Sequence, residues 1–152
     1  MSGRAKPRDQ FLLTERELQT VALAADGLTL HSIARRLTVT YGAVQSRLKF
    51  ARLKSGAPRT TALVHSVYAS KQLPPPATEQ PVPLSADQMQ VLGYLSEGLT
   101  AADMRARVSW PEYRLRDAYA DLLEALDAAD RPAYAIKRAW AMGHLGQEQQ
   151  PT

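Results

Sequence analysis

The chain contains no cysteine and no long uninterrupted hydrophobic run. Without cysteine it can form no disulfide framework, no cysteine-ligated zinc site and no thiol nucleophile. No apolar segment approaches the roughly 20 residues that a membrane-spanning helix needs, and no segment of signal-peptide length follows the basic N-terminus. A chain of 152 residues suits one compact domain or two very small ones. The absence of cysteine fits a reducing compartment, so we expect a cytoplasmic protein without a membrane anchor.

Catalytic motifs are also missing. His31, His65 and His144 stand alone, without the spacing of a metal site. No phosphate-binding loop or nucleophile accompanies the acidic residues, so we expect neither an enzyme nor a cofactor or metal ion. No segment remains for a separate receiver or ligand-binding domain, so a signal would have to act through abundance, a partner or the second half of the chain.

Charge is distributed unevenly along the chain. Residues 1–72 contain twelve Lys and Arg against four Asp and Glu, a net charge of +8. Residues 84–145 contain seven against nine, a net charge of −2. Halves that differ this much should not share a partner.

A proline-rich segment separates the two halves. Residues 72–83 contain five prolines, which exclude a helix or a central strand. We expect a semi-rigid extended linker at 72–83, with one domain at 11–71 and another at 84–146. Residues 1–10 would form a flexible basic arm, either near a minor groove or inert, and 147–152 a flexible tail.

The sequence of the first half recurs in the second at a spacing of 71 residues. Each copy has a capping box, then a glycine suited to end a helix, then a threonine suited to cap the next one. These residues are Thr14 with Glu17, Gly27 and Thr29 in the first copy, and Ser85 with Gln88, Gly98 and Thr100 in the second. Chance similarity of two alanine-rich helices is the alternative, but the fixed register favours duplication.

The first copy has the pattern of a helix-turn-helix. Apolar periodicity predicts a short helix over 30–37, a longer one from Tyr41 to about Ser55 capped by Thr40, and a fourth helix over 59–68. Two helices joined by a turn of three or four residues make up a helix-turn-helix. Its internal seam would contain Ile33, Ala34, Leu37, Val39, Val44, Leu48 and Ala51.

The motifs of this copy resemble the LuxR-type DNA-binding domain. They read Leu-Thr-Glu-Arg-Glu-Leu at 13–18, Gly-Leu-Thr at 27–29, Ile-Ala-Arg-Arg-Leu at 33–37, Val-Gln-Ser-Arg-Leu at 44–48 and Lys-Ser-Gly-Ala-Pro-Arg-Thr-Thr-Ala-Leu-Val at 54–64. The resemblance covers residues 13 to about 70. It implies a four-helix fold whose third helix reads the major groove and whose fourth commonly forms a dimer contact. Region 4 of sigma factors has a similar helix-turn-helix, but the segment after Gly56 fits the LuxR type better. Gln45, Arg47 and Ser55 depart from the usual family residues.

Three residues on one side of the expected third helix are candidates for contacts with DNA bases. Gln45, Ser46 and Lys49 lie opposite the apolar face, at the positions where family members usually contact bases. A glutamine amide can pair with adenine, and a lysine can donate to guanine. Candidates for phosphate contacts are Thr29, Arg35, Arg36, Thr40, Arg47, Arg52 and Lys54. The alternative is an ordinary solvated helix face.

The second copy loses this basic pattern. Arg116, Asp117 and Ala120 replace the base-contact residues, and further acids follow, so phosphate would be repelled. We expect Pro111 in the first turn of its third helix, with Ser109 or Trp110 as the cap. The copy would serve either packing or contact with a protein.

The last helix of the second copy, over about 133–142, has a face suited to close helix contact, formed by Ile136, Ala139, Trp140 and Gly143. We predict that this face pairs within one chain or between two chains, as a pseudo-dimer or a homodimer. An ordinary core face would explain the same residues.

Together these features predict an all-α protein of two tandem four-helix LuxR-like units, the second degenerate. Its expected function is sequence-specific binding of double-stranded DNA as a bacterial or bacteriophage-borne transcriptional regulator, associated with the nucleoid when bound. The alternative is an adaptor or anti-activator that holds another transcription protein through the acidic second copy.

Overall fold

The computed structural model describes residues 11–146, which form eight helices and no strand. The predicted all-α class is therefore confirmed over these residues, while the arm at 1–10 and the tail at 147–152 lie outside them. The helices are α1 (Glu15–Ala25), α2 (Leu30–Leu37), α3 (Tyr41–Ser55), α4 (Thr60–Ala69), α5 (Ala86–Ser96), α6 (Ala101–Arg107), α7 (Glu112–Ala125) and α8 (Pro132–Ala141).

The helices recur in the register expected from the sequence. α5, α6 and α7 begin 71 residues after α1, α2 and α3, and α8 begins 72 residues after α4. Both capping boxes form, at Thr14 and Ser85. Gly27 and Gly98 have φ angles of 88° and 86°, which favour glycine. We refer to residues 11–71 as the first repeat and 84–146 as the second.

The start of α7 differs from the expectation. α7 begins at Glu112, and Pro111 occupies the N-cap position with an extended ψ of 149°, so it lies outside the first turn. Pro111 aligns with Thr40, the N-cap of α3. Because proline has no side-chain acceptor, α7 lacks the side-chain cap that Thr40 gives α3.

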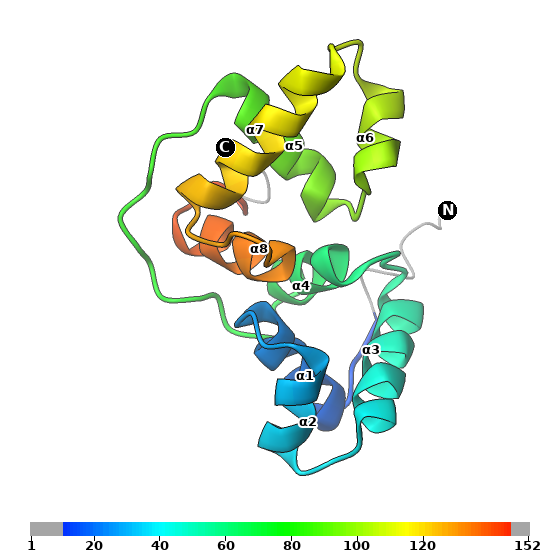
Figure 1. Ribbon diagram of the computed structural model, residues 1–152. Helices are drawn as coiled ribbons and strands as arrows, with labels where there is room; N and C mark the ends of the chain where they lie inside the picture. The colour runs from blue at the N-terminus through cyan, green and yellow to red at the C-terminus, as the bar shows by residue number, and fades with distance from the viewer. Residues whose placement is uncertain (1–10, 147–152) are drawn as a thin grey trace, which may run out of the picture.

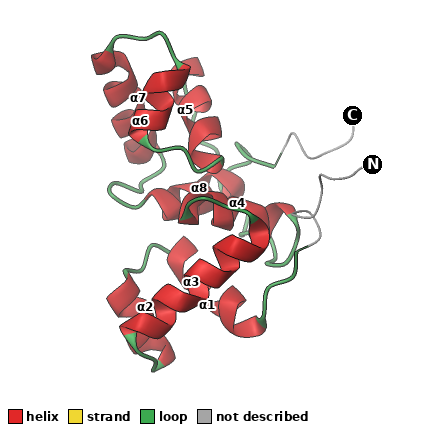
Figure 2. Cartoon of the chain, turned by 90° about the vertical axis from the view of Figure 1, so that its right-hand side faces the viewer, coloured by secondary structure: helices red, strands yellow, loops and turns green. Residues whose placement is uncertain are grey.

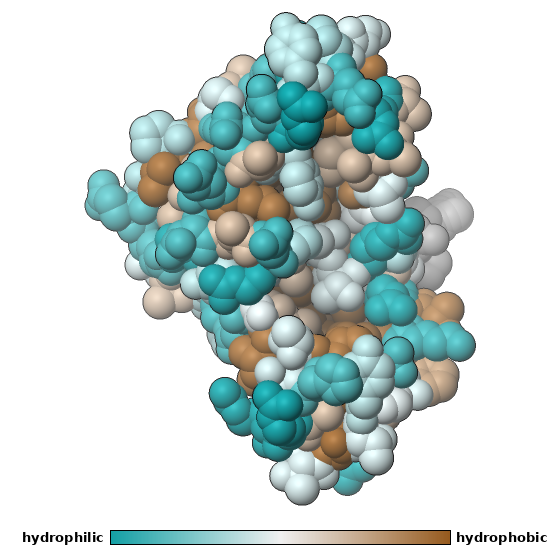
Figure 3. Space-filling view, in the orientation of Figure 1, coloured by the Kyte–Doolittle hydropathy of each residue, from teal (hydrophilic) through white to brown (hydrophobic). Residues whose placement is uncertain are grey.

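The two repeats share one hydrophobic core. α4 packs against α8 between the two halves, and both views show these helices side by side (Figures 1 and 2). α1 also contacts α8, and α4 contacts α5. These two contacts are equivalent, because exchanging the repeats turns each of them into the other. On the surface, the outline narrows where the repeats meet (Figure 3).

The proline-rich segment is attached to the second repeat rather than acting as a free spacer. It loops along one side of the molecule without helix (Figure 1). The Glu79 N–H donates to the Ala141 carbonyl at 2.8 Å, the Glu79 carboxylate pairs with Arg138, and Nε2 of His144 lies 2.8 Å from the Val82 carbonyl oxygen. The segment therefore holds the end of α8 while it connects the repeats.

None of the eight helices within residues 11–146 is both long enough and apolar enough to cross a bilayer.

Candidate nucleic-acid interface

The helix-turn-helix of the first repeat positions α3 by local signals. α2 ends at Thr38, which has a left-handed φ of 57°. The Thr40 hydroxyl then accepts from the Ala43 N–H at 3.0 Å and starts α3. Val44, Leu48 and Ala51 are at most 4% exposed and face α1, α2 and α4, as the periodicity predicts. This burial fixes which side of α3 faces outward.

The outward face of α3 contains the three residues predicted to contact bases. Gln45, Ser46 and Lys49 are all exposed. In Figure 2, α3 crosses the front of the first repeat with no other helix over it. Two large apolar side chains extend the same exposed surface, since Phe50 is 53% and Leu53 66% exposed.

Several cations surround this face, and none of them has a carboxylate partner among residues 11–146. Arg47 and Arg52 are half-buried, whereas Arg35, Arg36 and Lys49 are exposed. None of the five forms an ion pair with another residue in the range 11–146, although Arg35 donates to the Ser32 hydroxyl at 3.3 Å. Cations without a protein counter-charge are available to neutralise phosphates.

Lys54 differs from these cations because it is already paired. Its ammonium donates to Oε1 of Glu17 at 2.8 Å, and the Glu17 side chain is only 9% exposed. Burial acts to raise the pKa of Glu17, but hydrogen bonds from Lys54 and the Thr14 backbone outweigh it, so the pKa lies below its ordinary value. A phosphate contact by Lys54 would compete with this ion pair.

The two threonines predicted to contact phosphate have different surroundings. Thr40 is exposed at the start of α3. Thr29 is exposed as well, but it caps α2 and lines a groove between the repeats, together with Arg131 and Tyr134 of the second repeat. The structure thus places Thr29 against the second repeat, which its position in the motif does not indicate.

The equivalent helix of the second repeat has no unpaired cation. Arg114 makes a bidentate contact with Asp87 at 2.8 and 2.9 Å, and Arg116 lies 3.6 Å from Asp117. Arg116, Asp117 and Ala120 are exposed as their alignment with α3 implies, and so are Asp121 and Glu124. The outward surface of α7 therefore has exposed carboxylates, and its two arginines are paired with carboxylates, in contrast with the surface of α3.

The face predicted to mediate pairing lies against the first repeat of the same chain. Ile136 and Ala139 are fully buried. Nε1 of Trp140 donates to Nδ1 of His65 at 3.0 Å, and its ring centroid lies 5.7 Å from that of Tyr68. Burial raises the pKa of this tyrosine to about 12.

Gly143 does not belong to that helix face. It lies beyond the end of α8 with a φ of 80°, where it reverses the chain. The helical extrapolation that grouped it with Trp140 was wrong, because a left-handed residue ends the periodicity.

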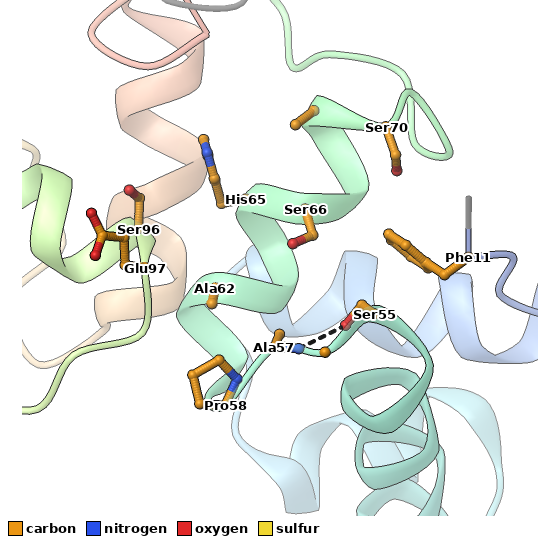
Figure 4. Close-up of a pocket in the computed structure, with 12 residues that line it drawn as sticks. Phe11, Ser55, Ala57, Pro58, Ala62, His65, Ser66, Ser70, Ser96 and Glu97 are labelled. Carbon is orange, nitrogen blue, oxygen red and sulfur yellow. Dashed lines mark hydrogen bonds between the residues drawn. The ribbon is translucent and has the colours of Figure 1, made fainter. Parts of the chain in front are cut away.

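A hollow of about 540 Å³ runs along α4 between the ends of α3 and α5 (Figure 4). Small polar side chains line it, including Ser66 and Ser70, with Phe11 at one side and Glu97 at the other (Figure 4). The Ser55 hydroxyl accepts from the Ala57 N–H at 3.3 Å and orders the turn after α3. Within residues 11–146, no group of three or more His, Asp or Glu is arranged to hold a metal ion.

Comparisons with protein-family models, curated protein sequences and solved structures found no match to this chain.

Some features of the surface are invisible to motif analysis. The pairing of Lys54 with Glu17, and of Lys137 with Asp26, joins residues 37 and 111 positions apart. The groove beside Thr29 combines residues from both repeats. No local spacing signals such contacts, because they depend on how the repeats pack.

Proposed function

We propose that the protein is a sequence-specific double-stranded DNA-binding regulator of transcription that inserts α3 into the major groove. The observation that carries this proposal is the outward face of α3, on which Gln45, Ser46 and Lys49 are exposed on a helix held rigidly by its buried side. An α-helix fits the major groove, where glutamine and lysine side chains can distinguish base pairs.

Phosphate contacts come from the cations around α3 that form no ion pair within residues 11–146, chiefly Arg35, Arg36, Arg47 and Arg52. They neutralise phosphates and displace counterions. With four such contacts, the logarithm of the binding constant should fall linearly with the logarithm of the salt concentration, with a slope of about −3.6.

Each chain supplies one reading helix. The position equivalent to α3 in the second repeat is taken by α7, whose cations Arg114 and Arg116 are both paired with carboxylates. The second repeat therefore acts as a built-in packing partner for α4. The DNA site is then a single, non-palindromic half-site.

The test is binding-site selection followed by gel-shift titration of the full chain. Wild type is expected to select a preferred sequence. The double variant Gln45→Ala with Lys49→Ala should lose about 30-fold or more of the preference over random DNA, because it removes two base contacts and each gives roughly 1–3 kcal/mol of discrimination.

The matched control is Arg116→Ala, at the position of α7 equivalent to Gln45. Its side chain is also exposed, but it lies outside the proposed reading helix, so this variant should retain wild-type selectivity. Wild-type selectivity in the double variant would show that α3 is not the reading helix.

The acidic surface of α7 favours a second candidate, an adaptor or anti-activator that binds another transcription protein. Asp117, Asp121 and Glu124 are exposed there, and Tyr113 is 60% exposed. Under this alternative, the protein would bind DNA weakly and without sequence preference, and the charge reversal Asp117→Lys with Asp121→Lys would abolish regulation.

A further inference from the structure

A groove of about 460 Å³ lies between the two repeats, and apart from Thr29 its lining residues have no part in the DNA-binding proposal. The turn between α1 and α2, the start of α4, the end of α5 and the start of α8 all contribute to it. Its apolar lining includes Leu28, Leu95, Leu99, Tyr119 and Tyr134. The volume falls within the range of sites that hold small organic molecules.

Each repeat contributes one arginine to this groove. Arg59 precedes α4 and Arg131 precedes α8. Neither forms an ion pair with a carboxylate in the range 11–146. Arg131 instead lies over the ring of Tyr134, 4.7 Å from its centroid, and Arg59 donates to the Pro58 carbonyl at 3.0 Å.

Two carboxylates must be weighed against these arginines. Asp130 also lines the groove, and Asp103 lies close enough for the charge of Arg59 to lower its pKa, although hydrogen bonds from Thr100 are the main cause. Because Asp103 is held by Thr100 and does not line the groove, the lining itself has two positive charges and one negative charge. That balance suits a monoanion.

Hydrogen-bond donors without a partner open on the same groove. α4 and α8 both begin there, and neither has a side-chain cap. Thr61 in the first turn of α4 is only 8% exposed and lines the groove, yet its hydroxyl has no hydrogen-bond partner among the described residues. A buried hydroxyl without a partner is unfavourable, and an anionic oxygen would satisfy it.

We propose that this groove binds a small organic monoanion with an apolar body. Its carboxylate or equivalent group lies among Arg59, Arg131 and the Thr61 hydroxyl, and its body lies on Leu28, Leu95 and Leu99. The ligand would contact both repeats at once, so it would stabilise their packing. This site is independent of DNA binding and gives the chain a place to receive a chemical signal.

The test uses 1-naphthoate and its neutral counterpart 1-naphthamide as probes of matched shape, titrated into the full chain and followed by calorimetry. Naphthoate is expected to bind about tenfold more tightly than the amide, because a charge-assisted contact is stronger than a neutral one. Bound naphthoate should also raise the melting temperature of the protein. Inorganic phosphate, which lacks an apolar body, should bind at least tenfold more weakly.

Two groove variants and one control make the test specific. Arg131→Gln should reduce naphthoate affinity about tenfold, with little change for naphthamide. Thr61→Val should weaken naphthoate binding while leaving the melting temperature of the free protein unchanged or higher, since it removes an unsatisfied hydroxyl. Arg16→Gln, an exposed position of α1 that does not line the groove, should bind naphthoate like wild type.

Equal affinity for naphthoate and naphthamide, or no binding of either at millimolar concentration, would overturn the proposal. So would wild-type affinity in Arg131→Gln, or phosphate binding as tight as that of naphthoate.

Discussion

At the scale of single residues, two equivalent glycines allow the repeats to approach each other. A Cβ on Gly27 would lie 3.0 Å from Cδ of Arg131, and a Cβ on Gly98 would lie 2.9 Å from Cγ of Pro58 and 3.1 Å from Cβ of Ala62. Each glycine thus meets the start of the fourth helix of the other repeat. Both the left-handed backbone and the close contact favour glycine here.

Replacing Gly98 tests this double requirement. We expect Gly98→Ala to destabilise the protein by about 1–3 kcal/mol, because alanine is strained at a φ of 86° and its Cβ would overlap Pro58. The melting temperature should fall by roughly 2–4 °C per kcal/mol.

Gly93, in the interior of α5, is the matched control. A Cβ there would meet nothing within 4 Å, so Gly93→Ala should stabilise the protein by about 0.5–1 kcal/mol. If both variants melted at the same temperature, the close contact of Gly98 with Pro58 would not contribute to the stability of the protein.

The sequence predicted these residues only in part. A glycine that follows a helical pattern and precedes a capping threonine is a local signal, so Gly27 and Gly98 could be assigned to helix ends. Their contacts with Arg131 and Pro58 are not local. Gly27 and Arg131, for example, are 104 positions apart and lie together only because the repeats pack.

At the scale of helices, the bounds predicted from caps and periodicity agree closely with the structure. The expected helices at 30–37 and 41–55 are α2 and α3, because Thr29 and Thr40 supply side-chain acceptors at their starts. The start of α7 was wrong by one position. The fixed φ of proline suits the first turn of a helix, so Pro111 was expected inside α7. In the structure Pro111 is instead the N-cap, and its side chain cannot accept a hydrogen bond.

The contact between α1 and α3 provides a pH-dependent test at this scale. Because the folded pKa of Glu17 is lowered, its ion pair with Lys54 stabilises the protein above the unfolded pKa of about 4.3 and is lost as the pH falls through the folded pKa. Glu17→Gln keeps a capping side chain but removes the charge. At pH 7 we expect this variant to be less stable by about 1 kcal/mol, measured by thermal or urea unfolding.

The difference between Glu17→Gln and wild type should shrink as the pH is lowered through the folded pKa of Glu17, because the wild-type carboxyl then becomes neutral as well. Glu15→Gln is the control, since Glu15 is exposed and forms no ion pair with residues 11–146. A stability difference that does not change as the pH is lowered would contradict the role assigned to the charge of Glu17.

At the scale of the whole molecule, the sequence indicated two similar units but not how they pack. The five prolines between them are typical of a spacer, and nothing local shows that Glu79 would bond to the end of α8. The apolar faces of α4 and α8 were recognisable, with Leu63 and Ile136 fully buried in the structure. Whether such faces pair within one chain or between two chains depends on how the linker places the repeats, and the spacing of apolar residues carries no information on that.

The last prediction concerns the number of chains on DNA. Because α4 already packs against α8, and Trp140 donates to His65 across that contact, the face predicted to pair is already covered within the chain. We therefore expect the full chain to be monomeric by light scattering at micromolar concentration. Sites recovered by selection should be non-palindromic, and each short duplex should bind one chain without cooperativity.

The result can be separated from the DNA-binding proposal itself. Since α7 has acidic residues where α3 has its reading face, doubling the half-site as an inverted repeat should yield two independent binding events rather than one tighter complex. Cooperative binding of two chains to a palindromic site would contradict the pseudo-dimer while still supporting α3 as the reading helix. Failure to select any sequence would instead remove the DNA-binding proposal and leave the internal pairing of the repeats intact.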